Sequence, residues 1–339
     1  MTTPRVLEVK RLLVRAPNWL GDAVMALPAL ETVRRAFAGR TLIVAALPSV
    51  APIFEERSGA APDEVLAIDR ARELEQVRSA KADGILLLPN SFGSAWLARR
   101  SGAAERWGYR TSGRGWLLTR GVVRPRGQLH QVQYYLELVR GLGLQAAADQ
   151  EVRPRMDPRP ATLEKADALL GAAGLSSGQK IVGFAPGAAY GHAKQWPPDR
   201  VAQVIGEISR HGVAAVMVGA GADRDTGRAI ESSLPPGVRV VNLIGCTSLR
   251  QLVGIVARCA AFVSNDSGAM HIAAALGVPL TAMFGPTDER VTAPAGDADV
   301  ITRDVFCRPC MLRECPIDHR CMKRIEVDAV LQSITSHLK

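Results

Sequence analysis

The chain has 339 residues, of which 47% are hydrophobic and 22% charged, a composition typical of folded proteins and unlike that of disordered ones. This length is long for one hydrophobic core and suits two domains. The formal net charge of +9 favours an anionic partner, whereas the low aromatic content of 5% and the lack of a zinc-finger or RNA-binding signature disfavour nucleic acid.

The amino-terminal sequence argues against an export signal. Residues 1–18 lack the apolar core and cleavage site of a signal peptide, and no run approaches the roughly 18 apolar residues that cross a bilayer. The sequence therefore predicts a cytoplasmic protein.

The first half of the chain predicts a Rossmann-like domain over residues 1–160. Helical patterns such as 71–80 separate apolar runs that are typical of buried strands. Alternating strands and helices of this kind form parallel sheets. The strand-like runs are 11–17, 41–48, 64–69 and 83–89.

A polar, proline-containing stretch at 148–166 predicts a linker, after which a second Rossmann-like domain is expected over 161–322. Residues 323–339 predict a C-terminal helix, for which packing back across both lobes is one option. The second domain's strand-like runs are 180–187, 214–219, 240–245, 260–266 and 279–285. Its helical runs are 198–211, 224–234, 248–258 and 268–276.

The loop after the first predicted strand carries a candidate general base. In NWLGDAVMALPAL (18–30), Gly21 and Asp22 stand where a strand gives way to a helix. A ligand can approach the glycine backbone there, and the carboxylate can face a cleft. Asn18 is a further candidate contact in the same loop. Taken alone, Asp22 also fits a helix N-cap.

A second strand-to-helix loop, FAPGAAYGHAKQWP (184–197), favours phosphate binding. The backbone amides at Gly187 and Ala188 and the following helix N-terminus can bind an anion, while Lys194 supplies a mobile positive charge. The alternative is a glycine- and proline-containing connector with a solvated lysine.

A third segment, VSNDSGAMHIAAALGVP (263–279), joins an apolar strand directly to a small-residue helix. A pyrophosphate can approach the serine hydroxyl and the first amides of that helix. The alternatives are an aspartate that caps the helix and a histidine that belongs to the core. The candidate residues are Asp266, Ser267, Gly268, Ala269 and His271.

Together these segments resemble glycosyltransferase family 9, the ADP-heptose heptosyltransferases, over essentially the whole chain. The resemblance implies the α/β GT-B architecture, in which two Rossmann-like domains face an interdomain cleft, the first binding the acceptor and the second the nucleotide sugar. The stretches that carry it are RAPNWLGDAVMALPAL (15–30), PGAAYGHAKQWP (186–197), SNDSGAMHIAAALGVP (264–279), FGPTD (284–288) and CRPCMLRECPIDHRCM (307–322).

The resemblance implies inverting, metal-independent transfer of heptose from ADP-heptose to the heptosyl-Kdo-lipid A inner core of lipopolysaccharide, as its second heptose and without a cofactor. In that reaction Asp22 is the general base, and Lys194 and the amides of the third segment stabilise the leaving diphosphate. Asp223 is the nearest candidate for holding the donor's ribose.

A basic segment lies in the first domain, where residues 99–126 contain one acid, Glu105, and eight arginines: Arg99, Arg100, Arg106, Arg110, Arg114, Arg120, Arg124 and Arg126. Interleaved with them are Trp96, Trp107, Tyr109 and Trp116. Arginine binds phosphate and aromatic side chains rest at lipid interfaces. We expect contact with the phosphorylated Kdo-lipid A acceptor or peripherally with the cytoplasmic face of the inner membrane; a solvated basic face is the alternative. The candidate acceptor-binding residues are Asn18, Gly21, Arg99, Arg100, Arg110 and Arg114.

Four cysteines, Cys307, Cys310, Cys315 and Cys321, crowd into the last motif. Their number suits a structural zinc or iron–sulfur site without a catalytic role, although the spacing fits no standard zinc ribbon. Four packed thiols are the alternative.

Three other functions remain open from the sequence. One is a family 9 transferase acting on another core heptose or with another nucleotide sugar. Another is a sugar-nucleotide epimerase of the same shape. The third is a non-catalytic nucleotide- or nucleic-acid-binding module, which the basic charge motivates.

Overall fold

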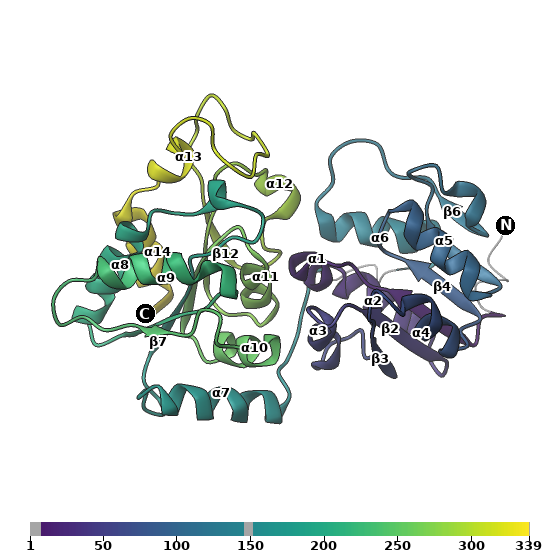
Figure 1. Cartoon of the computed structure of the whole chain (residues 1–339), viewed down its shortest axis with the longest axis horizontal. Coiled ribbons are helices and arrows are strands. Elements are labelled where there is room, and N and C mark those ends of the chain that lie inside the picture. Colours follow the sequence, from purple (N-terminus) through teal and green to yellow (C-terminus); the bar gives the residue numbers. More distant parts are fainter. Residues whose placement is uncertain (1–7, 146–151, 339) are drawn as a thin grey trace. The chain divides into compact units, whose positions relative to one another are not determined.

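The chain divides into two units, Met1–Asp157 and Pro158–Lys339. The computed structural model describes residues 8–145 and 152–338 (Figure 1). Residues 1–7 of the amino-terminal stretch, 148–151 of the predicted linker and residue 339 of the predicted tail lie outside the described residues. The linker was predicted too long, because its end from Pro160 onward is helical; proline is favoured in a helix's first turn, where its missing N–H costs nothing.

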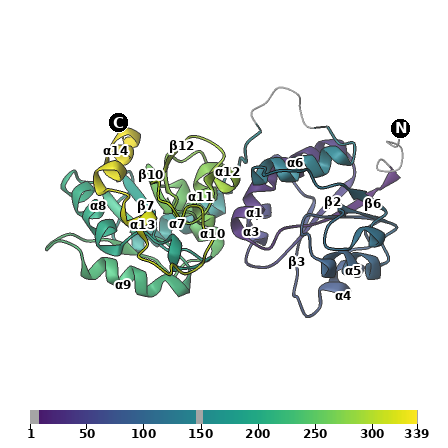
Figure 2. The ribbon, with the colours of Figure 1, turned by 90° about the horizontal axis from the view of Figure 1, so that it is seen from above.

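Unit 1 is a six-stranded parallel sheet with the strand order β3-β2-β1-β4-β5-β6. Its strands are β1 (Arg11–Arg15), β2 (Thr41–Ala46), β3 (Glu64–Ala67), β4 (Gly84–Leu87), β5 (Glu105–Tyr109) and β6 (Arg120–Val122). Its helices are α1 (Leu20–Met25), α2 (Leu27–Ala36), α3 (Ala51–Glu55), α4 (Glu73–Ser79), α5 (Phe92–Ser101), the 3-10 turn η2 (Gly115–Leu117) and α6 (Gln131–Gly141). Figure 2 shows α6 on one side of the sheet and the neighbouring α4 and α5 on the other.

Unit 2 repeats this topology, with the strand order β12-β11-β10-β7-β8-β9. Its strands are β7 (Ile181–Ala185), β8 (Ala214–Met217), β9 (Val241–Asn242), β10 (Ala261–Asn265), β11 (Leu280–Met283) and β12 (Ala298–Ile301). Its helices are α7 (Pro160–Ala172), η3 (His192–Lys194), α8 (Pro198–Arg210), η4 (Gly221–Asp223), α9 (Arg224–Ser232), α10 (Leu249–Ala257), α11 (Gly268–Ala275), α12 (Glu289–Thr292), α13 (Arg320–Lys323) and α14 (Val327–Leu338).

Both sheets have the doubly wound order in which the strand sequence reverses direction at one point. In unit 1 this point lies between β1 and β4, where Val14 stands opposite Leu86. In unit 2 it lies between β7 and β10, where Phe184 stands opposite Val263. Ligands of doubly wound proteins bind outside the carboxyl ends of the strands at this point. The three segments singled out in the sequence follow β1, β7 and β10.

The central strands are buried because helices cover both faces of each sheet. All five residues of β7 and of β10 are buried, and β1 is buried from Leu12 onward. Such strands appear in the sequence as continuous apolar runs without alternation. The single helix expected after β1 is broken at Ala26, because a new helix, α2, begins at Leu27 with Pro28 in its first turn.

The C-terminal helix α14 belongs to unit 2, whereas the sequence placed residues 323–339 outside the second domain. Val330 and Ile334 join the hydrophobic cluster that α8 forms with the sheet, and α14 lies beside α8 (Figures 1 and 2). Ser333 also donates a hydrogen bond to Asp299 at 2.6 Å. Among the described helices, none is long and apolar enough to cross a membrane.

Candidate active site

Asp22 is the third residue of α1, in the loop-and-helix that follows β1. It is not the N-cap, because that position belongs to Trp19, whose side chain makes no capping hydrogen bond. Burial raises the pKa of Asp22 from 3.8 to about 6. A helix's first turn favours the charged carboxylate, so in this site the loss of water outweighs the helix dipole.

No hydrogen bond or ion pair to the Asp22 carboxylate is found within residues 8–145 and 152–338. Tyr135 on α6 interacts with it electrostatically: burial, and secondarily the charge of Asp22, raise the pKa of Tyr135 well above its ordinary value. A carboxylate with a pKa of about 6 is still ionised at neutral pH but is more basic than an ordinary aspartate. It is therefore suited to accept a proton from a substrate.

Arg15, which the sequence analysis missed, fixes the loop before Asp22. It ends β1, is 6% exposed, and pairs with Glu73 at 2.7 Å. Its guanidinium also donates to the Ala16 carbonyl and, at 2.8 Å, to the side-chain oxygen of Asn18. The signal was available, because a charged residue in an otherwise apolar strand must find partners. Asn18 itself is exposed and Gly21 half-buried.

In unit 2 the structure brings Lys194 and Asp266 together from loops 72 residues apart. The ammonium of Lys194 donates to the Asp266 carboxylate at 2.6 Å, and the two side chains are only 10% and 7% exposed. Thr287, from the FGPTD stretch, donates to the same carboxylate oxygen at 2.7 Å. Lys194 was predicted to be a mobile charge; the pairing and the burial show that it is held in place. Asp266 was also considered as a helix cap, but that position is held by Ser267.

The aromatic ring of Tyr190 also contacts Lys194. The Lys194 ammonium lies 4.6 Å from the centroid of the Tyr190 ring, and the Arg313 guanidinium lies 5.1 Å from it. The Tyr190 hydroxyl donates to the carbonyl of Met311 at 2.8 Å. Two cations over one ring, with one carboxylate among them, leave this loop with an excess of positive charge, which favours a phosphate-bearing ligand.

Asn265, the last residue of β10, ties both ends of the loop after β7. Its side-chain amide donates to the Pro186 carbonyl at 2.6 Å, and its side-chain oxygen accepts from the Trp196 backbone N–H at 3.2 Å. Asn265 is completely buried. The loop that carries Gly187, Ala188 and Lys194 is thereby fixed to the neighbouring strand.

The start of α11 has no side-chain cap. Its N-cap residue, Ser267, directs its hydroxyl to Ser264 at 3.0 Å instead of to the helix amides. The first amides of a helix have no partner within the helix, so those of Gly268 and Ala269 are suited to an anion. His271 is buried at 5% exposure one turn into the helix.

Asp223, at the end of η4, is brought against Gly187 at the end of β7. A Cβ built on Gly187 would lie 2.1 Å from the Asp223 carboxyl carbon, so a larger residue at position 187 would displace that carboxylate. The carboxylate also accepts from the Ala220 N–H at 2.9 Å. The predicted ribose contact and the predicted phosphate loop are therefore neighbours in unit 2.

The arginine-rich segment is more heterogeneous than its sequence indicates. Arg114 was predicted to bind the acceptor, which is wrong: it is 0% exposed and its donors are used by the chain, including the Pro89 carbonyl at 2.6 Å and the Tyr109 carbonyl at 3.0 Å. Trp107 and Tyr109 are core residues. The exposed candidates are Arg99, Arg100 and Arg110.

The cysteine motif shows no metal-binding arrangement. Over residues 8–145 and 152–338, no three His, Cys, Asp or Glu side chains are placed to hold a metal ion, so the predicted structural zinc or iron–sulfur site finds no support. Cys321 is buried in the core of unit 2, and burial raises its pKa. Although burial opposes it, backbone N–H groups of residues 317–319 hold the pKa of Cys315 below its usual value. All four cysteines of the motif are free thiols: Cys307, Cys310, Cys315 and Cys321.

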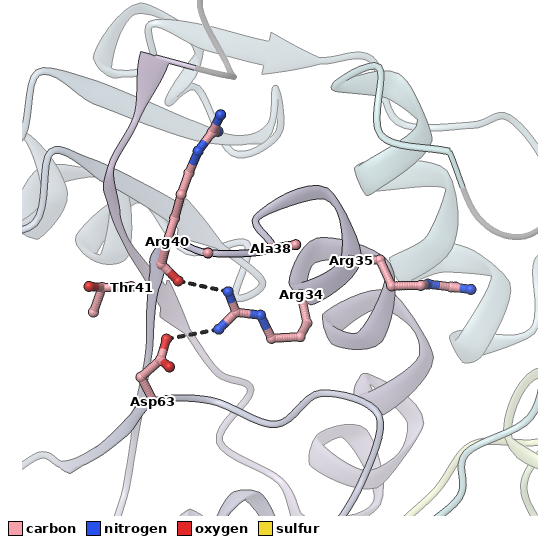
Figure 3. A pocket seen from close by; sticks show the side chains of 7 residues that line it. Arg34, Arg35, Ala38, Arg40, Thr41 and Asp63 are labelled. Atoms are coloured by element: carbon pink, nitrogen blue, oxygen red, sulfur yellow. Dashed lines mark hydrogen bonds and ion pairs between the residues drawn. The ribbon is translucent and has the colours of Figure 1, made fainter.

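A cavity of about 650 Å³ lies elsewhere, between the end of α2 and the start of β2. Figure 3 shows Arg34 held between the Asp63 carboxylate and the Arg40 carbonyl, at 2.8 and 2.7 Å. This cavity is at the amino end of β2, whereas doubly wound folds bind ligands at the carboxyl ends. We therefore place the candidate functional groups at the carboxyl edge of each sheet: Asp22 in unit 1, and Lys194 with Asp266 in unit 2.

The two sheets and their loops define a glycosyltransferase of the GT-B class. The structure of Escherichia coli ADP-heptose lipopolysaccharide heptosyltransferase II matches with a TM-score of 0.82 and 28% identity, covering 97% of this chain and 98% of that one. A family 9 glycosyltransferase from Veillonella parvula shares the fold, with a TM-score of 0.83 and 20% identity, covering 97% of each chain.

Sequence comparison gives the family. The model described as "Glycosyltransferase family 9 (heptosyltransferase)" matches residues 70–320. Lipopolysaccharide heptosyltransferase 2 of Salmonella typhimurium is 31% identical, covering 84% of this chain and 85% of the relative. Lipooligosaccharide heptosyltransferase 2 of Haemophilus influenzae is 30% identical, covering 86% and 88%. The chain belongs to glycosyltransferase family 9, which confirms the predicted fold class and family; the roles of the individual residues stay predictions.

Proposed function

We propose that this glycosyltransferase moves heptose from ADP-heptose to the heptosyl-Kdo-lipid A inner core of lipopolysaccharide, adding the second heptose with inversion and without a metal. The names of similar proteins support this proposal: the similar E. coli structure is an ADP-heptose lipopolysaccharide heptosyltransferase II, and the relatives from S. typhimurium and H. influenzae are a lipopolysaccharide and a lipooligosaccharide heptosyltransferase 2. The enzyme would then work at the cytoplasmic face of the inner membrane, where a lipid-linked acceptor is reached from the cytoplasm.

The observation that carries this proposal is the desolvated, unpaired carboxylate of Asp22, whose pKa burial raises to about 6. A carboxylate oxygen of Asp22 accepts the proton of the acceptor's attacking hydroxyl. At the same time the hydroxyl oxygen bonds to the anomeric carbon of the donor. The bond from the anomeric carbon to the diphosphate breaks in the same displacement, and ADP leaves. One displacement on the face opposite the leaving group inverts the configuration, and no covalent enzyme intermediate forms.

Unit 2 supplies the groups that stabilise the diphosphate as it gains charge. The N-terminal amides of α11 at Gly268 and Ala269 lack a side-chain cap, and the ammonium of Lys194 is oriented by Asp266. Donors held in place before the reaction lower the barrier, because they need not reorganise when charge develops. Asp223, beside Gly187, is the proposed partner of the ribose hydroxyls.

The test is transfer of radiolabelled heptose from ADP-heptose to core acceptors that carry zero, one or two heptoses, with and without EDTA. We expect product from the one-heptose acceptor alone, unaffected by EDTA and abolished in Asp22→Ala. Preference for another acceptor would move the enzyme to a different step of core synthesis. Folded protein that binds ADP and transfers to none of the acceptors would overturn the proposed function.

A further inference from the structure

Three aromatic side chains that no catalytic step uses lie together on the surface of unit 1. Phe92 and Trp96 are one turn apart on α5, on the same face of the helix, and are 44% and 45% exposed. Trp116, on η2, is 71% exposed, and its ring centroid lies 6.3 Å from that of Phe92. Exposed aromatic residues that gather in this way mark an interaction surface.

Two arginines continue this face along α5. Arg99 and Arg100 are three and four residues beyond Trp96 and both are exposed, so they follow the aromatics on the same side of the helix. The stretch from residue 92 to residue 100 is about 12 Å long. We call Phe92, Trp96, Trp116, Arg99 and Arg100 the aromatic–arginine face.

The buried Arg114 holds the two elements of this face together. It directly precedes η2 and donates to the carbonyls of Pro89 and Ser91, at 2.6 and 3.2 Å, and to the Ser94 hydroxyl at 3.0 Å. Those acceptors surround the start of α5. The aromatic pair of α5 and η2 is thus fixed on a rigid base at the carboxyl edge of the first sheet, beside the end of β4.

Charge decides what this face can bind. Residues 92–117 contain four arginines besides the buried Arg114, and one acid, Glu105, whose carboxylate accepts from Trp107 at 2.9 Å. Unit 2 also exposes apolar side chains, including Phe306 at 79% and Ile317 at 50%. Residues 303–319 contain three arginines and three acids, although the Arg320 guanidinium lies 4.9 Å from the centroid of the Phe306 ring. An anionic bilayer therefore attracts residues 92–117 electrostatically more strongly than residues 303–319.

We propose that the aromatic–arginine face docks the enzyme on an anionic lipid bilayer, the aromatic rings entering the headgroup region and the arginines contacting lipid phosphates. Tryptophan and phenylalanine next to cationic side chains are the composition that binds at a bilayer interface. This inference rests on the proposed function, because a lipid-linked acceptor requires the carboxyl edge of the first sheet to work at the membrane surface.

The experiment measures binding of the full chain to vesicles of phosphatidylethanolamine with and without phosphatidylglycerol, by sedimentation. The wild type is expected to bind the anionic vesicles and to bind less in high salt. Trp96→Ser/Trp116→Ser should lower the partition coefficient at least tenfold, and Arg99→Gln/Arg100→Gln should lower it by about fivefold per arginine. Because Trp96 and Trp116 are exposed, the fold should persist, which circular dichroism checks.

The matched control is Phe306→Ser/Ile317→Ser, which removes two exposed apolar side chains from the neutral segment of unit 2. It should bind vesicles like the wild type. Wild-type protein that ignores anionic vesicles, tryptophan variants that bind unchanged, or equal losses in the control would each overturn the proposal.

A second readout separates this proposal from the proposed function. With a water-soluble, deacylated core acceptor, Trp96→Ser/Trp116→Ser should transfer heptose at the wild-type rate, and with acceptor in vesicles it should be slower. Vesicle binding in the absence of any transfer would sink the proposed function alone. Transfer to the soluble acceptor together with unchanged vesicle binding by the variant would sink the docking face alone.

Discussion

The two units share one strand order, yet the loops after their first strands differ in whether a buried charged side chain has a partner of opposite charge. After β1, Asp22 is desolvated and has no cationic partner among the described residues, and its pKa rises to about 6. After β7, Lys194 is desolvated together with Asp266, so each charge offsets the other. An unpaired buried charge is ready to take a proton, whereas a paired one fixes a position. We therefore expect proton transfer to depend on the first loop and donor placement on the second.

The largest expected effect separates the two loops by kinetics. Asp22→Asn keeps the size of the side chain and removes the base, so kcat should fall about 10³-fold, while the Kd for ADP stays within about twofold. Isothermal titration with ADP and initial-rate measurements test this. A loss of ADP binding that matches the loss of rate would mean that Asp22 holds the donor instead.

The buried pair of unit 2 should respond with a loss of stability. Lys194→Met leaves the Asp266 carboxylate buried without its cation, which costs about 3–5 kcal/mol of unfolding free energy. Lys194→Met/Asp266→Asn removes both charges and should recover most of that loss in urea denaturation, without recovering ADP affinity. A double variant as unstable as the single one would show that the pair's charges are not what stabilises the loop.

Removing the charge at Asp22 should instead stabilise the protein. Because its folded pKa is raised, Asp22 contributes stability below pH 3.8 that is lost as pH rises through about 6. At pH 7.5 the unfolding free energy of Asp22→Asn, measured by urea denaturation, should therefore exceed that of the wild type by about 1–3 kcal/mol. This difference should vanish near pH 3.5. Equal stability at pH 7.5 would contradict the desolvation of this carboxylate.

The smallest expected effect is on the pH dependence of the rate. If the ionised Asp22 is the base, kcat/KM should be flat above pH 7 and about tenfold lower at pH 5. Lys194→Arg, a charge-preserving control in the other unit, should leave the shape of this profile unchanged. A midpoint that moves with the lysine variant would show that proton transfer at Asp22 depends on the loop of unit 2.

The fold was predictable because its signals are local. The buried parallel strands β1, β7 and β10 appear as continuous apolar runs, and the loops after them contain the glycines and small residues that a doubly wound fold places near its ligands. The break at Ala26 was missed because the apolar pattern continues across Pro28, although a proline in a helical pattern is itself a signal.

The position of a candidate residue was predictable where it follows from the residue's own loop, and not where it depends on distant partners; the roles of these residues stay predictions. The positions of Asp22 and Lys194 after strands could be seen in the sequence. The burial of Arg114 could not, because two of its acceptors, Pro89 and Ser91, lie 25 and 23 residues earlier. The pairing of Asp266 with Thr287 likewise needs the fold to bring two strand ends together.

The hydrogen bonds of the Asn265 side chain affect how long a bound donor remains on the protein. By bonding Pro186 and Trp196, one amide side chain closes a loop whose ordering entropy is then incurred during folding and not on each encounter with a nucleotide. Replacing the amide by a carboxylate would set two oxygens against each other at Pro186 and reopen the loop. The donor would then bind a flexible segment, and its residence time, more than its arrival rate, would shorten.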